Sequence, residues 1–451
     1  MHPLVILLLS IAVVFLLILR LKINAFLALI TAAMTVGLLS TRIPLAEVMP
    51  KVAGTFGTVC GKIAIVIALA ALVGECMMES GAADKITRVF VRLLGQKRAS
   101  LSLLSAAYVE SIPVFFDTVF YLMVPLARAM RVRTGRNYLL YVMAIAAGGA
   151  VAHSLIPPTP GPVAMAAALN LDLGAVIIVG FIIGIPTATA GWLFSVHRNH
   201  HMEVPFRETS GMSLAELREL ALQEDEKLPG FLHSLAPILL PVLFITSNTV
   251  AAPAGAGSSL LKVTSFLGNP NFALMLSAAI SLHLVAKYRG YTLAQLVKPV
   301  ETALASGGLI ILITAGGGAF GGMLVEAGVG QSLGDAAQQF NVPLLLLGFL
   351  LAVLLKIAQG SGTVAMITVS SIMAPLIVAA PPAYHPVYVA MAIGSGSLVG
   401  SWMNDSGFWI FAKMSGLTEA EALKTWTPLL MVLGCTGFLT TVVAAMLVPL
   451  R

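Results

Sequence analysis

The chain has 451 residues, of which 58% are hydrophobic and only 10% are charged, and its formal net charge is +6. An ordinary soluble domain carries about a quarter charged residues, so this composition excludes a water-soluble globular protein. The Lys and Arg residues lie mostly between apolar runs, which indicates membrane topology rather than nucleic-acid binding. Cys60, Cys76 and Cys435 show neither a disulfide framework nor a metal-ligand spacing, so we expect no metal and no cofactor.

The first apolar runs predict membrane-crossing helices at 4–19, 24–40 and 54–78, close to the ~20 residues that span a bilayer. The segment Met1 to Arg20 lacks a basic n-region and a small-residue cleavage pattern. We therefore interpret it as the first crossing of a multi-pass inner-membrane protein and not as a signal peptide.

A predicted re-entrant hairpin follows at about 99–130. Basic clusters flank it on both sides, at Lys85–Arg98 and at Arg128–Arg136, and by the positive-inside rule both clusters are cytoplasmic. The middle of the segment is polar and contains proline, in the run Glu110-Ser111-Ile112-Pro113, with Asp117 just beyond. A non-helical tip at membrane depth must be buried in protein or line a water-filled cavity.

The next crossing, at 138–170, is predicted to break at 157–161. Its run from His153 to Pro162 contains four prolines, and no uninterrupted helix survives them. A further crossing follows at 174–196. The polar residues 197–231 then predict a cytoplasmic linker, in which Ser213–Lys227 is expected to form a short surface helix.

The second half repeats this order. Crossings are predicted at 232–252, 269–286, 303–327, 387–414 and 427–448, with a hairpin at about 343–379 and a helix break at 404–407. Matches such as Leu45 with Leu293, Glu79 with Glu326 and Ser154 with Ser401 recur at a nearly constant offset, which indicates an internal repeat.

The flanks of the second hairpin contain no Lys or Arg outside the membrane, so we expect that hairpin to enter from the outside. The predicted fold is therefore an all-α polytopic membrane protein. It consists of two inverted repeats, 1–196 and 232–451, each with five transmembrane helices, a re-entrant hairpin and a broken helix. Both termini are then outside.

Paired helix breaks in two halves are the best pointer in a sequence to the binding site of a transporter. The N–H groups at the start of each broken segment carry partial positive charge and bind anions, and nearby hydroxyls and amides can bind a polyhydroxylated substrate. These features predict the following substrate-binding residues: Ser111, His153, Ser154, Thr159, Gly161, Gly360, Ser361, Thr363, Asn404 and Ser406.

Carboxylates inside a bilayer are costly and usually mark ion or proton paths. Glu110, Asp117 and Asp405 are therefore the candidates for proton coupling, and Asp117 and Asp405 are favoured because each lies at a tip or a break. Glu79 and Glu326 lie near helix ends and are interpreted as capping or interfacial residues.

Two further ionisable residues leave alternatives open. His153 either relays a proton or is neutral and packed. Lys356 precedes the second hairpin tip, where it either attracts an anion or extends its ammonium group to the interface.

Four motifs carry a resemblance to a known family: Glu110–Asp117, His153–Pro162, Ala358–Ala365 and Asn404–Trp409. Over nearly its whole length the chain resembles the gluconate:proton symporter (gluconate permease, GntP-type) family of the ion-transporter superfamily. The resemblance implies uptake of sugar acids, chiefly gluconate, driven by the proton gradient, although one branch takes D-serine. It also implies an elevator-like transport domain, and a homodimer is expected because members of this superfamily are often dimers.

The chain departs from the family pattern at three positions. It has Trp402 where His is common, Gly362 where Ala is usual and Asp117 where Glu is common. The loss of an ionisable group at 402 leaves the exact substrate open and weakens a proton-relay role there.

We therefore expect a transporter that imports gluconate or a related sugar acid with protons. Sodium-coupled uptake of a small carboxylate is the main alternative, because unwound carbonyls at helix breaks also suit sodium. An intramembrane enzyme is disfavoured, since neither HExxH nor GxSxG occurs in a supporting context. A passive channel is the remaining alternative, and accumulation against a gradient would exclude it.

Overall fold

The structure is a computed structural model that describes residues 1–95, 98–207, 228–252, 259–329, 332, 343–403 and 405–450. Every regular element within these ranges is helical. Eight of the described helices are long and apolar enough to cross a membrane, and four further apolar helices are shorter. The prediction of an all-helical, multi-span membrane protein is thus confirmed.

The first half contains the long helices α3 and α9, the shorter pair α5 and α6, and one helix that is interrupted between α7 and α8. Asn24 and Asp172 begin α2 and α9 by accepting hydrogen bonds from the backbone N–H groups of Phe26 and Ala175. The helices of this half are α1 (Pro3–Phe15), α2 (Ala25–Leu39), α3 (Val48–Ser80), α4 (Ala82–Leu94), α5 (Ala99–Glu110), α6 (Phe116–Thr134), α7 (Tyr138–Leu155), α8 (Pro160–Ala168) and α9 (Leu173–His201).

The described helices of the second half follow in chain order. These are α11 (Phe231–Ala251), α12 (Ser259–Leu267), α13 (Pro270–Arg289), α14 (Val297–Glu326), α16 (Leu344–Gln359), α17 (Gly362–Ala379), α18 (Val387–Gly396), α19 (Ser406–Met414) and α20 (Glu419–Leu447). The expected surface helix at 213–227 lies outside the described residues.

The structure places several boundaries differently from the prediction: α3 begins at Val48 and α14 at Val297, six residues before the predicted 54 and 303. Helix α7 ends at Leu155 and α8 begins at Pro160, so the chain is non-helical at 156–159, where the predicted break was 157–161. The second break is longer than the predicted 404–407, because α18 already ends at Gly396 and the left-handed Gly400 (φ 79°) turns the chain before α19. Helix α20 begins at Glu419, eight residues before the predicted 427, because Thr418 and Glu421 form a reciprocal capping box.

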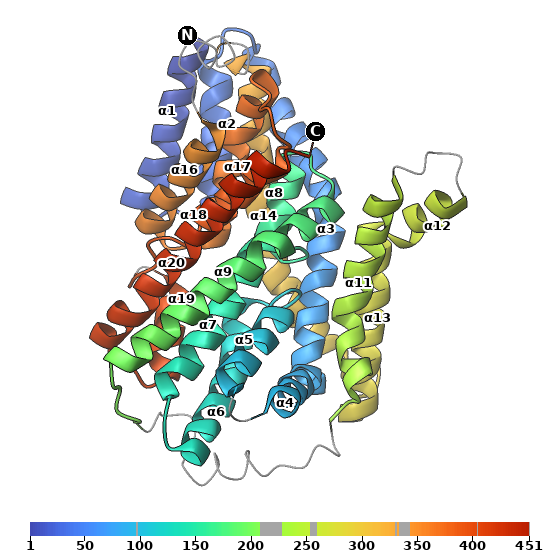
Figure 1. Cartoon of the computed structure of the whole chain (residues 1–451). Coiled ribbons are helices and arrows are strands. Elements are labelled where there is room, and N and C mark those ends of the chain that lie inside the picture. Colours follow the sequence, from blue (N-terminus) through green and yellow to red (C-terminus); the bar gives the residue numbers. More distant parts are fainter. Residues whose placement is uncertain are drawn as a thin grey trace.

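The halves pack into each other reciprocally. Helix α3 lies along α14, and each of them also contacts the helix that precedes its partner in the chain: α13 for α3 and α2 for α14. The segment after each break crosses over in the same way, so that α8 packs on α17 and α19 packs on α6. Both chain ends lie at the same end of the molecule (Figure 1).

Candidate substrate site

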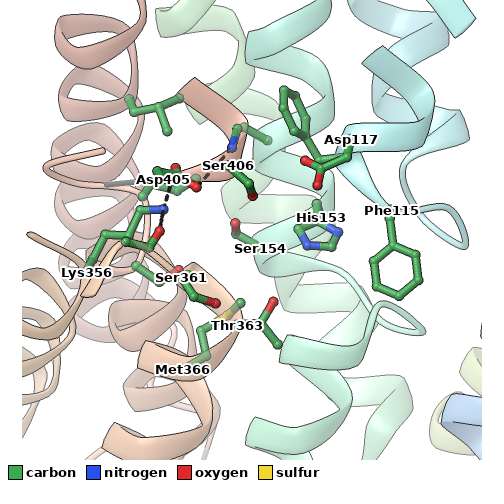
Figure 2. A pocket seen from close by; sticks show the side chains of 18 of the residues that line it. Phe115, Asp117, His153, Ser154, Lys356, Ser361, Thr363, Met366, Asp405 and Ser406 are labelled. Atoms are coloured by element: carbon green, nitrogen blue, oxygen red, sulfur yellow. Dashed lines mark hydrogen bonds and ion pairs between the residues drawn. The ribbon is translucent and has the colours of Figure 1, made fainter. Parts of the chain in front are cut away.

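A cavity of about 680 Å³ lies where the two hairpins and the two broken helices converge. Its volume falls in the range of about 300–1,000 Å³ that is typical of small-molecule sites. Residues from the starts of α6, α17 and α19 and from the last turns of α7 and α16 line it, and α14 closes one side through Ser306, Leu309 and Ile310. Figure 2 shows the labelled side chains facing this common space.

Lys356 supplies a buried positive charge to the cavity wall. It lies in the last turn of α16 and is only 4% exposed, so it does not extend to the interface. Its ammonium group lies 2.7 Å from Oδ2 of Asp405 and donates to the carbonyl oxygen of Gly360 at 2.6 Å. The ion pair joins the tip of the second hairpin to the second helix break (Figure 2).

Asp405 is held by several donors besides Lys356. The Ser401 hydroxyl donates to the same carboxylate oxygen, and the backbone N–H of Gly407 donates to the other one at 3.1 Å. Asp405 thereby caps α19. The Trp426 indole N–H fixes Ser401 by donating to its hydroxyl oxygen at 2.6 Å.

Asp117 is the second carboxylate that lines the cavity, in the first turn of α6. It is half-buried and accepts no hydrogen bond from the part of the chain that the structure describes. His153 lies nearby in the last turn of α7, with its ring centroid 6.1 Å from that of Phe115. Its Nδ1 is buried and lacks a partner among the described residues.

The second hairpin turns within two residues at its tip. Gly360 adopts a left-handed φ of 88°, which glycine accommodates without strain, and it ends α16. Ser361 then caps α17 by accepting from the backbone N–H of Val364 at 3.3 Å. As a result, Gly362 and Thr363 bring the N-terminus of α17 to the cavity, which also receives the first residues of α6 and α19.

The structure brings most of the predicted site residues together. The cavity wall contains His153, Ser154, Gly360, Ser361, Thr363, Ser406, Asp117 and Asp405. Asn404 lies outside the described residues. The sequence reasoning missed Ser397, Phe115, Trp426 and the α14 residues, because nothing in their local pattern separates them from ordinary packing.

Four predicted residues lie away from the cavity lining. Glu110 is fully buried and accepts from the Thr87 hydroxyl at 2.6 Å, and Ser111 is buried beside it. Thr159 donates to the carbonyl oxygen of Ile156 at 2.6 Å. Gly161 allows close packing, because a Cβ there would lie 2.2 Å from Cε of Met366. The functional roles of these residues remain predictions.

The matched pair Glu79 and Glu326 also lies outside the cavity lining. Each connects the halves near a helix end: Tyr291 donates to Glu79 at 2.6 Å, and Lys51 donates to Glu326 at 2.6 Å. Both glutamates thus have a partner in the other half of the chain, and their interpretation as capping or interfacial residues stays a prediction.

A bundle of membrane-spanning helices with a charged, hydroxyl-lined cavity at its helix breaks defines a small-molecule transporter of the membrane. Comparisons with known proteins make this more specific. The family model "GntP family permease" matches residues 2–447. The chain therefore belongs to the GntP family of permeases, and it is a transporter rather than an enzyme.

Individual relatives agree with this assignment. The chain is 34% identical to the inner membrane permease YgbN of Escherichia coli over 432 residues, which are 94% of each chain. It is also 34% identical to the gluconate permease of Pseudomonas aeruginosa, over 93% of this chain and 92% of that protein. The protein is thus a multi-span permease of the inner membrane.

One solved structure has a similar fold. The YdaH transporter of Alcanivorax borkumensis aligns with a TM-score of 0.66, covering 100% of this chain and 99% of its own. At 14% sequence identity, this likeness concerns the fold alone.

Proposed function

We propose that this permease imports gluconate or a related sugar acid together with a proton. The observation that carries the proposal is one cavity that joins three helix N-termini, several hydroxyl groups and a carboxylate without a described partner, Asp117. Helix N-termini attract anions, and hydroxyls can exchange hydrogen bonds with a polyol chain. The gluconate permease of Pseudomonas aeruginosa supports this substrate class by its name.

Charge balance supports Asp117 as the group that takes up the proton. The Lys356–Asp405 pair is neutral as a unit, so Asp117 carries the remaining charge among the lining carboxylates. A substrate anion and a negative Asp117 in one small cavity repel each other, and this repulsion is strong where the dielectric constant is low. A proton on Asp117 removes it, so that substrate and proton are taken up together.

The reciprocal packing of the halves supports an inverted repeat with its boundaries at 196 and 232. In such a repeat α8 corresponds to α19 and α17 corresponds to α6. The contact of α8 with α17 then corresponds to the contact of α19 with α6. The site lies between α14 and the hairpins, which suits a transport domain sliding along α3 and α14 in an elevator-like movement. We also propose that the permease forms a homodimer in the bilayer.

Counterflow with purified protein in liposomes tests the substrate. Vesicles preloaded with unlabelled gluconate should accumulate labelled gluconate transiently, and other aldonates should compete while D-serine should not. Replacing sodium by choline should leave the rate unchanged. Loss of counterflow in choline would favour sodium coupling, and absence of counterflow with every aldonate would contradict the proposed substrate class.

A further inference from the structure

The ion pair between Lys356 and Asp405 is the strongest unexplained charge arrangement in the cavity. The two side chains are only 5% and 11% exposed, and both line the cavity. Buried ion pairs contribute little net stability, because desolvation of both charges offsets their attraction. A pair of apolar side chains could join α16 to α19 equally well. The position of the ion pair in the cavity wall therefore indicates a role in ligand binding.

The two side chains differ in the hydrogen-bond partners that each would keep if the ion pair separated. Asp405 would keep the Ser401 hydroxyl and the Gly407 N–H as donors, and Ser401 is itself fixed by Trp426. The carboxylate can therefore give up the ammonium group without becoming a bare buried charge. The Lys356 ammonium group would keep the carbonyl oxygen of Gly360 as an acceptor. A neutral carbonyl does not balance a buried positive charge, which needs another anion in place of the carboxylate.

We propose that Lys356 and Asp405 form an exchangeable pair, in which the substrate carboxylate takes the place of Asp405 on the Lys356 ammonium group. Lys356 is then the group that recognises a carboxylate, and Asp405 is its counter-charge in the empty site. This inference rests on the proposed function and names the residue that selects acids over neutral polyols. It also links occupancy to structure, because exchange releases the α16 tip from the start of α19.

The test compares binding of gluconate and of its neutral amide, gluconamide, to purified full-length variants by calorimetry. Asp405→Asn retains an oxygen that can cap α19 but removes the competing charge, so gluconate should bind about tenfold or more tightly. The double variant Lys356→Met/Asp405→Asn leaves no unpaired charge, and its preference for gluconate over gluconamide should fall by about tenfold or more. Lys356→Arg should retain the preference.

Two further variants separate recognition from a purely structural link. The swap Lys356→Asp/Asp405→Lys keeps an ion pair but moves the cation to α19. This variant should lose the preference for gluconate over gluconamide. If the pair were only a structural link, the swapped variant would keep that preference. Lys413→Met is the matched control, since Lys413 pairs with Glu419 at 2.7 Å on the exposed end of α19.

If Lys356→Met/Asp405→Asn melts at the same temperature as the wild type and still prefers gluconate over gluconamide, the inference is overturned. Weaker gluconate binding in Asp405→Asn at unchanged stability would overturn it as well. Failure of the wild type to bind any aldonate would instead overturn the proposed function, and this inference with it.

Discussion

At the scale of single residues, two aspartates in one cavity have different surroundings. Asp405 is bound by Lys356, Ser401 and the start of α19, whereas Asp117 accepts no hydrogen bond from the described residues. We therefore propose that Asp117 rather than Asp405 takes up the proton.

Asp117→Asn should abolish coupling without abolishing binding. The amide is isosteric and neutral, so it resembles the protonated acid at every pH. Counterflow of labelled gluconate should persist, whereas accumulation driven by an imposed gradient of about one pH unit should fall about tenfold, because one co-transported proton supplies about a tenfold concentration ratio. The conservative variant Asp117→Glu should retain gradient-driven uptake. Normal gradient-driven accumulation by Asp117→Asn would show that another group takes up the proton.

The sequence identified both aspartates but could not separate their roles. Lys356 and Asp405 lie 49 positions apart, and only the folded hairpin brings them within 2.7 Å. Similarly, Glu110 and Asp117 share one motif, yet the turn between α5 and α6 directs the first to Thr87 and the second to the cavity. Tertiary pairing of this kind leaves no periodic signal in the chain.

At the scale of elements, seven of the ten predicted crossings coincide with helices long and apolar enough to span a membrane, and three coincide with shorter apolar helices. Hydropathy did not predict α4 or α12, which are short, and it placed the start of α20 too late. The run Thr418-Glu419-Ala420-Glu421 is a capping-box pattern that can be read from the sequence. The length of the second break could not be predicted, because residues 397–400 are as apolar and small as the helix before them.

Close contact between α7 and α5 depends on a glycine. A Cβ at Gly148 would lie 2.2 Å from the carbonyl oxygen of Leu104, which is backbone and cannot rotate away. Gly148→Ala should therefore destabilise the protein by about 1–3 kcal/mol, the usual cost of overpacking. Thermal unfolding in detergent measures this change.

Gly308→Ala is the matched control for that substitution. Gly308 lies inside α14, where a Cβ meets nothing within 4 Å. The alanine should be neutral or stabilise by about 0.4–1 kcal/mol, because it restricts the unfolded chain. Equal melting temperatures for the two variants would contradict the close packing of α5 against α7.

At the scale of the whole molecule, the proposed inverted repeat makes a prediction about sidedness. Leu45 and Leu293 occupy matching positions in the two halves and are 76% and 86% exposed. In a background without Cys60, Cys76 and Cys435, Leu45→Cys should react with a membrane-impermeant maleimide on intact cells. Leu293→Cys should react only after permeabilisation. Labelling of both from the same side would exclude inverted repeats.

The central claim is that a sugar acid and a proton enter together through the cavity that contains Asp117. Its most direct test is to add gluconate to weakly buffered proteoliposomes without an imposed gradient, while the external pH and the labelled gluconate taken up are recorded together. We expect external alkalinisation, with about one proton consumed per gluconate, in the wild type and not in Asp117→Asn. Gluconate uptake by the wild type without any change in external pH would contradict it.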